Sequence, residues 1–247
     1  MSLSRPRVTA LVDGSNYASS VAEHGAFLAG RSGARLQLRH VREDGQSPQA
    51  ARRLLEELAE RLVDLGAPRP DLSLVEGGVL DAAVGADAEV LVMGKRGMVD
   101  ARDALGRHVA PIVRAAGVPV CLASQVFLPV HRVLTVTDAD PARRVALDLV
   151  STHAGFDDVE LDCVVVSRPG ETPEEKLAIA RQALEGRAQA FAIHAERLGE
   201  AVWRYLAERP TDLIVISRAV LLGAEGPDLR VVRPGGLWSA RASVLIC

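Results

Sequence analysis

Two short groups of residues in the first half of the chain have the composition of an anion-binding site. The first group follows an apolar run near residue 12 and consists of Asp13, Gly14 and Ser15. The second follows a later apolar run ending at Met93 and consists of Gly94, Lys95, Arg96 and Gly97, with Gly106 and Arg107 beyond it. Glycines let a backbone approach a phosphate and turn its N–H groups toward it, and basic side chains add charge. The pattern indicates a site for a nucleotide or similar anion, although ordinary turns share this composition.

The surrounding sequence alternates short apolar runs with longer amphipathic segments. It predicts strands at 8–12, 35–41, 71–75, 88–93 and 118–123, and helices at 17–32, 48–65, 80–86 and 103–116. Alternating strands and helices predict an α/β fold with a parallel sheet. Both glycine-containing groups then lie beyond the carboxyl ends of strands, where such sheets bind ligands.

The second half of the chain repeats the first. Three apolar blocks, at 7–13, 89–93 and 118–123, recur in the same order at 132–138, 212–216 and 242–247. We therefore predict two tandem domains, 1–126 and 130–247, joined by a short linker. The second domain is predicted to have strands at 132–136, 159–166, 188–193, 213–216 and 243–246.

Composition excludes several functional classes. Of 247 residues, 48% are hydrophobic and none lie in an apolar run long enough to span a membrane. The net charge of −3 comes without a basic patch, so we expect no nucleic-acid partner. Cys121, Cys163 and Cys247 have no zinc-site or disulfide-framework spacing. We expect a cytoplasmic protein with neither a metal site nor a membrane partner.

Taken together, the two glycine-containing groups and the end of the second predicted strand resemble the universal stress protein family. The resemblance covers most of the first domain and, more weakly, the second, so the chain resembles a tandem universal stress protein. It implies two doubly wound domains of the adenine-nucleotide alpha hydrolase-like type. Each would have a five-stranded parallel sheet with helices on both faces, and the domains would pair through their last strands.

The resemblance also implies a nucleotide site in the first domain, with ATP and Mg²⁺ as the cofactor. Members that bind ATP carry a Gly-x2-Gly-x9-Gly-Ser/Thr loop. By this resemblance Asp13 and Val41 lie near the nucleoside, and the phosphates meet Gly94, Gly97 and Gly106. The remaining predicted nucleotide-binding residues are Gly14, Ser15, Met93, Lys95, Arg96 and Arg107.

This sequence departs from the family loop in two ways. Only eight residues separate Gly97 from Gly106, and Arg107 replaces the serine or threonine. The arginine either neutralises a phosphate or fills the pocket, and the sequence leaves both alternatives open.

The second domain has lost most of this pattern. Asp138 is retained, but Ala139 and Asp140 follow it, and Ser217 begins a stretch without the loop glycines. A carboxylate at Asp140 would repel a phosphate, so we expect no ATP here. This domain either completes the assembly or holds another ligand, with three arginines available for an acidic group: Arg218, Arg230 and Arg233. We expect residues 223–236 to be irregular.

These observations favour a non-catalytic stress-response protein. It would bind a nucleotide or similar anion in the first domain and act through protein partners, including copies of itself as a dimer or larger homo-oligomer. One alternative is an ATP-independent interaction module with both clefts non-functional. Another is a slow ATPase or nucleotidyl transferase, for which Asp13 is the obvious carboxylate.

Overall fold

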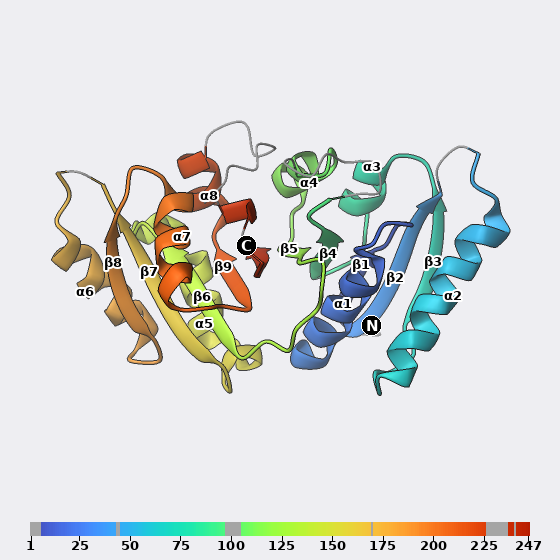
Figure 1. Cartoon of the computed structure of the whole chain (residues 1–247), viewed down its shortest axis with the longest axis horizontal. Coiled ribbons are helices and arrows are strands. Elements are labelled where there is room, and N and C mark those ends of the chain that lie inside the picture. Colours follow the sequence, from blue (N-terminus) through green and yellow to red (C-terminus); the bar gives the residue numbers. More distant parts are fainter. Residues whose placement is uncertain (1–5, 43–44, 97–104, 169, 226–236, 240) are drawn as a thin grey trace, which may run out of the picture. The chain divides into compact units, whose positions relative to one another are not determined.

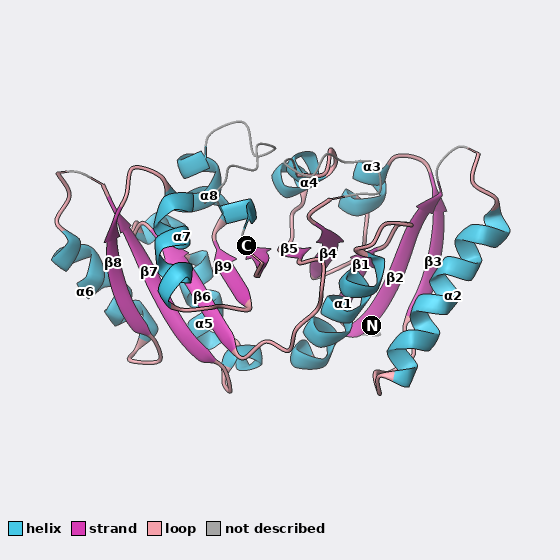
Figure 2. Cartoon of the chain, viewed as in Figure 1, coloured by secondary structure: helices cyan, strands magenta, loops and turns pink. Residues whose placement is uncertain are grey.

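The computed structural model describes the chain except for residues 1–5, 43–44, 97–104, 169, 226–236 and 240. Helices and strands alternate within each half of the described chain, and a loop without a helix joins the strands Val120–Ala123 and Arg132–Thr137 (Figure 2). The chain divides into two compact units, with the boundary between Phe127 and Leu128. Each unit has the parallel α/β architecture that the sequence predicts.

The first unit contains five parallel strands in the order β3-β2-β1-β4-β5 (Figure 1). The strands are β1 Arg7–Leu11, β2 Arg35–Arg42, β3 Asp71–Glu76, β4 Val90–Gly94 and β5 Val120–Ala123. The helices are α1 Ala18–Ser32, α2 Pro48–Asp64, α3 Val79–Val84 and α4 Val109–Ala115. Helix α1 contacts α2, and α3 contacts α4, so two pairs of helices cover the two faces of a doubly wound sheet. The strand order reverses between β1 and β4.

The second unit repeats this arrangement in the order β10-β9-β6-β7-β8. Its strands are β6 Arg132–Thr137, β7 Glu160–Ser167, β8 Gln189–His194, β9 Leu213–Ile216 and β10 Ser243–Ile246. Its α-helices are α5 Val145–Thr152, α6 Pro173–Leu184, α7 Leu198–Glu208 and α8 Arg218–Glu225, and its 3₁₀ turns are η1 Pro141–Arg143, η2 Ala154–Phe156 and η3 Leu237–Ser239. Here the strand order reverses between β6 and β9. The predicted pairing of the two last strands stays a prediction.

Local sequence signals explain where several helices begin and end. Helix α2 begins after Ser47, whose Oγ accepts the Ala50 backbone N–H at 3.1 Å. Its buried stripe of Leu55, Leu58 and Leu62 has helical spacing and faces the sheet. Helix α1 ends at Gly33, whose φ of 64° is the left-handed conformation that glycine adopts without strain.

Two predicted boundaries differ from the structure by more than two residues. The helix predicted from residue 103 begins at Val109, because Arg107 and His108 form a turn before it. Residues Gly223–Glu225, predicted to be irregular, continue helix α8. The rest of that predicted irregular stretch, 226–236, lies outside the described residues.

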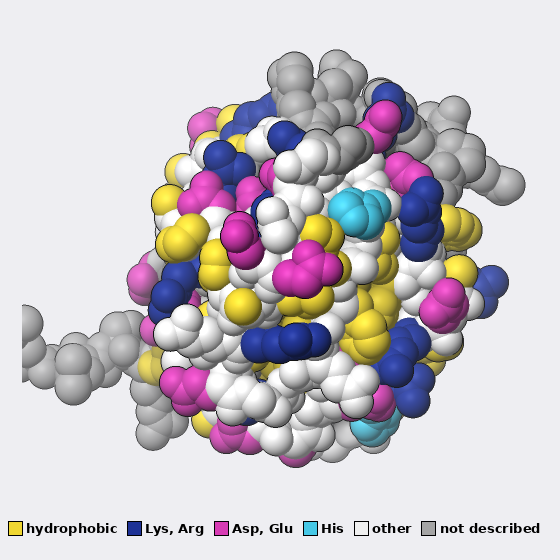
Figure 3. All heavy atoms as spheres, turned by 90° about the vertical axis from the view of Figure 1, so that its left-hand side faces the viewer, with side chains coloured by type: hydrophobic (Ala, Val, Ile, Leu, Met, Phe, Trp, Pro, Cys, Tyr) yellow, Lys and Arg dark blue, Asp and Glu magenta, His cyan; other side chains and the backbone are white. Residues whose placement is uncertain are grey.

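Strand β8 forms one end of the second unit's strand order, and its four central residues are half-buried. On this side of the molecule, hydrophobic side chains lie among charged ones (Figure 3). The guanidinium of Arg209 lies 4.7 Å from the centre of the Phe191 ring. Cations at an edge strand discourage pairing with another chain.

Candidate functional site

In the first unit, the predicted anion-binding residues gather where the strand order reverses. The first group forms the turn between β1 and α1. Asp13 Oδ1 accepts the Ser15 backbone N–H at 3.0 Å, and Ser15 Oγ accepts the Tyr17 backbone N–H at 3.2 Å. Gly14 lies between them. One carboxylate oxygen of Asp13 is therefore used to hold the turn that starts the helix.

The predicted nucleoside side of the cleft is bounded by the end of β2. Val41 is buried there, beside His40. His40 Nδ1 donates to the Val12 carbonyl oxygen at 2.8 Å, and its Nε2 lies 2.8 Å from the Gln46 side-chain amide. This buried imidazole ties the ends of β1 and β2 together, so its role is structural.

Gly94, the last residue of β4, is held against the turn that follows β1. A Cβ added to Gly94 would lie 3.0 Å from Tyr17 Cβ and 3.0 Å from the Arg96 carbonyl oxygen. Arg96 Nη1 donates to the Tyr17 hydroxyl at 3.5 Å. The preceding residue, Met93, is buried. Tyr17 therefore joins the two groups of residues, and packing against it already favours a glycine at position 94.

Lys95 does not present its ammonium group to the cleft. Its side chain is only 3% exposed, and burial, reinforced by the nearby Arg96 charge, lowers the pKa of Lys95 to about 8. Its backbone carbonyl oxygen accepts the Gly106 N–H at 2.8 Å. The positive charge expected from Lys95 is thus directed into the protein interior, and the backbone of this residue closes the loop instead.

The remaining loop residues lie at the entrance to α4. Arg107 Nε donates to His108 Nε2 at 3.0 Å on the exposed side of that turn. Gly97 lies outside the described residues. The structure therefore brings Asp13, Ser15, Gly94 and Arg96 together through Tyr17, and it joins Gly106 to the backbone of Lys95.

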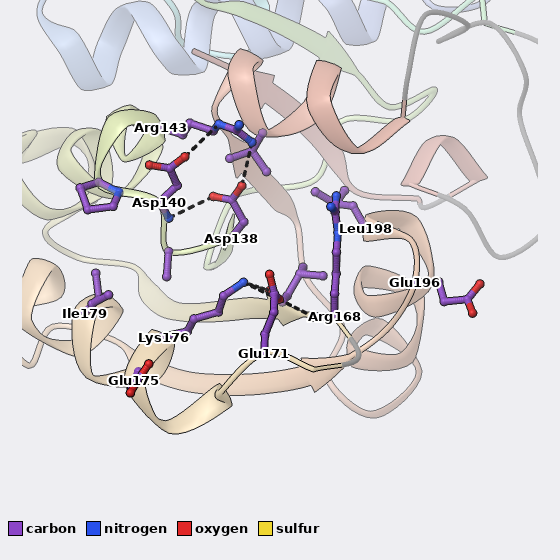
Figure 4. A pocket seen from close by; sticks show the side chains of 14 residues that line it. Asp138, Asp140, Arg143, Arg168, Glu171, Glu175, Lys176, Ile179, Glu196 and Leu198 are labelled. Carbon is purple, nitrogen blue, oxygen red and sulfur yellow. Dashed lines mark hydrogen bonds and ion pairs between the residues drawn. The ribbon is translucent and has the colours of Figure 1, made fainter.

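The second unit contains a pocket of about 420 Å³ at the carboxyl ends of β6 and β7 (Figure 4). This is the position equivalent to the predicted cleft of the first unit, because Asp138 follows β6 as Asp13 follows β1. A volume of this size is typical of sites for small molecules.

Ion pairs organise the pocket wall near β6. Arg143 donates from Nη1 to Asp138 Oδ2 at 3.0 Å, and its Nε lies 3.2 Å from Asp140 Oδ2. Asp138 Oδ1 accepts the Asp140 backbone N–H at 3.2 Å. Asp140 therefore shares the one positive charge of Arg143 with Asp138, and the expectation that it would repel a phosphate stays a prediction.

The wall near β7 carries a second ion pair. Lys176 Nζ, from α6, donates to Glu171 Oε2 at 2.6 Å and to the Val166 carbonyl oxygen at 3.3 Å. Figure 4 shows Lys176 and Glu171 directed toward one another beneath Asp138. Arg168, just after β7, extends along the wall beside Leu198.

Helix α8 replaces the glycine loop of the first unit. It begins at Arg218, two residues after the end of β9, and Ser217 Oγ accepts the Val220 backbone N–H at 3.2 Å. The buried side chain of Val220 lines the pocket. Arg218 is not among the lining residues, and Arg230 and Arg233 lie outside the described residues. Of the three arginines proposed for an acidic ligand, Arg218 is thus the one that the structure tests, and it does not line this pocket.

Sequence reasoning missed Tyr17, Arg143, Arg168 and Lys176. The spacing of Arg143, three residues after Asp140 and five after Asp138, was an available signal for an ion pair next to a tight turn. Arg168 and Lys176 come from segments whose convergence depends on how β7 and α6 pack, and the sequence pattern does not specify that.

Metal-binding clusters and membrane-spanning helices are both absent from the described residues. Among those residues, no group of three or more His, Cys, Asp or Glu side chains is placed to hold a metal ion. None of the described helices has the length and apolar character needed to cross a membrane.

The fold is shared by solved universal stress protein structures. A universal stress protein from Archaeoglobus fulgidus matches with a TM-score of 0.70 at 15% identity, covering 98% of this chain and 95% of that one. A putative universal stress protein from Pseudomonas aeruginosa matches with a TM-score of 0.65 at 15% identity, covering 98% and 92%. A functionally unknown Pseudomonas aeruginosa protein gives a TM-score of 0.62 at 14% identity, also covering 98% and 92%.

The sequence itself matches no protein-family model and no curated protein. The structural matches span both units and confirm the predicted resemblance at the level of the fold.

Proposed function

We propose that this chain is a ligand-binding regulatory protein of the universal stress protein type. Its first unit would bind a nucleotide or similar anion, with MgATP as the first candidate, at the carboxyl ends of β1, β2 and β4. Ligand binding there would alter how the protein engages protein partners.

The supporting observation is the convergence of Asp13, Ser15 and Arg96 at the reversal point of the strand order. Parallel sheets of this kind bind ligands at that point. Arg96, held near the Tyr17 hydroxyl, supplies a positive charge beside the backbone at Gly94. Asp13 would meet a nucleoside hydroxyl with the carboxylate oxygen that does not hold the turn.

A second candidate, an ATP-independent interaction module, is favoured by different observations. The ammonium of Lys95 is buried, and Tyr17 packing explains Gly94 without any phosphate. In this case the first cleft would be filled by the protein itself. A third candidate, slow ATP hydrolysis or nucleotidyl transfer, requires Asp13 to support turnover.

The test is a titration of the full chain with MgATP, followed by thermal unfolding and calorimetry. A ligand at 100 times its Kd stabilises the folded state by about 2.7 kcal/mol, which raises the Tm by several degrees. We expect this rise in the wild type and a much smaller one in Arg96→Glu. Arg52→Glu, a charge reversal at an exposed position on α2, is the matched control and should behave as the wild type.

The outcomes separate the three candidates. No stabilisation of the wild type at millimolar MgATP would overturn nucleotide binding and leave the interaction module. Release of phosphate or pyrophosphate that disappears in Asp13→Asn would support the enzyme. Equal binding by the wild type and Arg96→Glu would place the nucleotide elsewhere.

A further inference from the structure

We infer that the pocket of the second unit binds a small organic cation, a protonated amine or guanidinium group attached to an apolar body. This site is separate from the proposed nucleotide site of the first unit, and the inference does not depend on nucleotide binding there.

The charges that line the pocket do not balance. Among the described residues, five carboxylates line it, against three basic side chains. Arg143 is shared by Asp138 and Asp140, and Lys176 is paired with Glu171. These pairings leave Glu175 and Glu196 against Arg168. A concave site with an excess of carboxylates raises the local concentration of cations.

Two of the carboxylates are available to a ligand. Glu175 lies on α6 and Glu196 lies just before α7, on opposite sides of the pocket (Figure 4). Within the part of the chain that the structure describes, neither carboxylate has a hydrogen bond or an ion pair. Both side chains are exposed, and Figure 4 shows the Glu196 carboxylate directed away from the pocket, so the proposed binding requires that side chain to rotate toward the cation.

The rest of the lining suits an apolar body. Val166, Leu198 and Val220 are buried residues whose side chains contribute to the pocket surface, and Ile179 lies at its α6 side. Most of the described lining side chains are charged, so these apolar side chains form the part of the wall that an apolar body can contact, while the charged groups fix its orientation.

The same lining disfavours a polyphosphate. Where the first unit has glycines, α8 places the Val220 side chain, which offers no N–H group to a phosphate. The unpaired carboxylates would repel a triphosphate. Arg168 is the only basic lining side chain without a carboxylate partner among the described residues, and one arginine does not compensate for two carboxylates.

Two classes of ligand carry the predicted cationic group, plain amines and amino acids, and Arg168 distinguishes between them. A plain amine would use the carboxylates alone. An amino acid would place its amine at the carboxylates and its own carboxylate at Arg168.

The experiment is isothermal titration of the full chain with a panel of probes at physiological ionic strength. Putrescine, spermidine and agmatine represent plain cations, lysine and arginine represent amino acids, and glutamate is the anionic control. We expect saturable one-site binding of at least one cationic probe. Charge-assisted hydrogen bonds predict a Kd weakened about tenfold for each carboxylate removed in Glu175→Gln and Glu196→Gln.

The matched control is Glu174→Gln. It removes the same charge from the neighbouring position of α6, where the residue does not line the pocket, and it should leave the Kd unchanged. Amino acids that bind more tightly than plain amines, and lose that advantage in Arg168→Gln, would identify the amino-acid class. Amines that bind equally well in Arg168→Gln would identify the plain cation.

Three results would overturn the inference. The first is no saturable binding by any cationic probe at millimolar concentration. The second is binding that the double variant Glu175→Gln/Glu196→Gln does not weaken. The third is equal weakening by Glu174→Gln, which would indicate attraction to the general surface charge. MgATP binding to the same double variant measures the first unit separately and must remain as in the wild type.

Discussion

Tyr17 packs directly against Gly94, across the point where the strand order of the first unit reverses. A Cβ at position 94 would lie 3.0 Å from Tyr17 Cβ and equally close to the carbonyl oxygen of Arg96. The segments that contain Tyr17 and Gly94 are more than seventy residues apart in the sequence, and they pack closely because Gly94 has no side chain. The contact sets the position of Arg96, the charged group on which the proposed nucleotide site depends.

This contact predicts that Gly94→Ala destabilises the protein. Neither the Tyr17 Cβ nor the backbone at Arg96 is the flexible end of a side chain, so the added methyl group forces a backbone shift that costs about 1–3 kcal/mol. Urea unfolding would measure the change. The control is Gly30→Ala, because Gly30 lies within α1 with nothing within 4 Å of an added Cβ. That variant should be more stable by about 0.5–1 kcal/mol. Destabilisation by both variants would contradict the packing argument.

The buried imidazole of His24 predicts a loss of stability in mild acid. Burial lowers the pKa of His24 to about 4, against a backbone hydrogen bond to Ser20 that raises it. Between pH 6.5 and 4 the unfolded chain takes up a proton that the folded chain does not, so the free energy of unfolding falls as the pH falls. The contribution is about 3 kcal/mol across this window.

The measurement is urea unfolding of the wild type and His24→Gln at several pH values from 4 to 7. Because the variant also loses the ring contact with Phe127, the slopes against pH should be compared, not the absolute stabilities. The variant should have the shallower slope by up to one proton. Parallel slopes would show that His24 does not titrate differently in the two states.

The hydrogen bond from the Tyr205 hydroxyl to the buried carboxylate of Asp162 predicts that Tyr205 stabilises the fold. Asp162 is only 7% exposed, accepts a hydrogen bond from the Tyr205 hydroxyl, and is 3.1 Å from Arg209 Nη1. Burial, and then the bond to Asp162, raises the pKa of Tyr205, so the hydroxyl remains a donor at neutral pH. Tyr205→Phe removes that donor and should cost about 1–3 kcal/mol of unfolding free energy. An unchanged denaturation midpoint would mean that Arg209 alone satisfies the carboxylate.

The three cysteines are predicted to be unreactive in the folded protein. Cys121 and Cys163 are buried, and burial raises the pKa of each thiol to about 12, as it does for Cys247. At pH 8 each carries about three orders of magnitude less thiolate than an ordinary cysteine, and thiolate is the reactive form. A disulfide reagent should therefore label the native protein slowly and all three thiols rapidly in guanidinium chloride. Rapid labelling of one thiol in the native state would identify it as accessible.

The sequence by itself determined the repeat, the alternation of elements and the class of sheet. Strand β9 can be recognised from its apolar run because a strand buried on both faces is apolar throughout. Helix α2 can be recognised because Ser47 and Pro48 mark its start and its leucines recur at helical spacing. These signals involve residues that are near one another in the sequence, so they can be identified without the tertiary structure.

Tertiary structure decided how the charged residues are used. Lys95 and Arg96 are adjacent in sequence, yet the end of β4 directs the lysine into the core and leaves the arginine beside the Tyr17 hydroxyl. Arg143 pairs with Asp140 only because the loop after β6 folds back on itself. Glu175 and Glu196 share a pocket because β7 and β8 lie side by side and bring their following segments together. Charge at a site is a sum over atoms that are close in space, and distance in space is what the order of residues leaves unspecified.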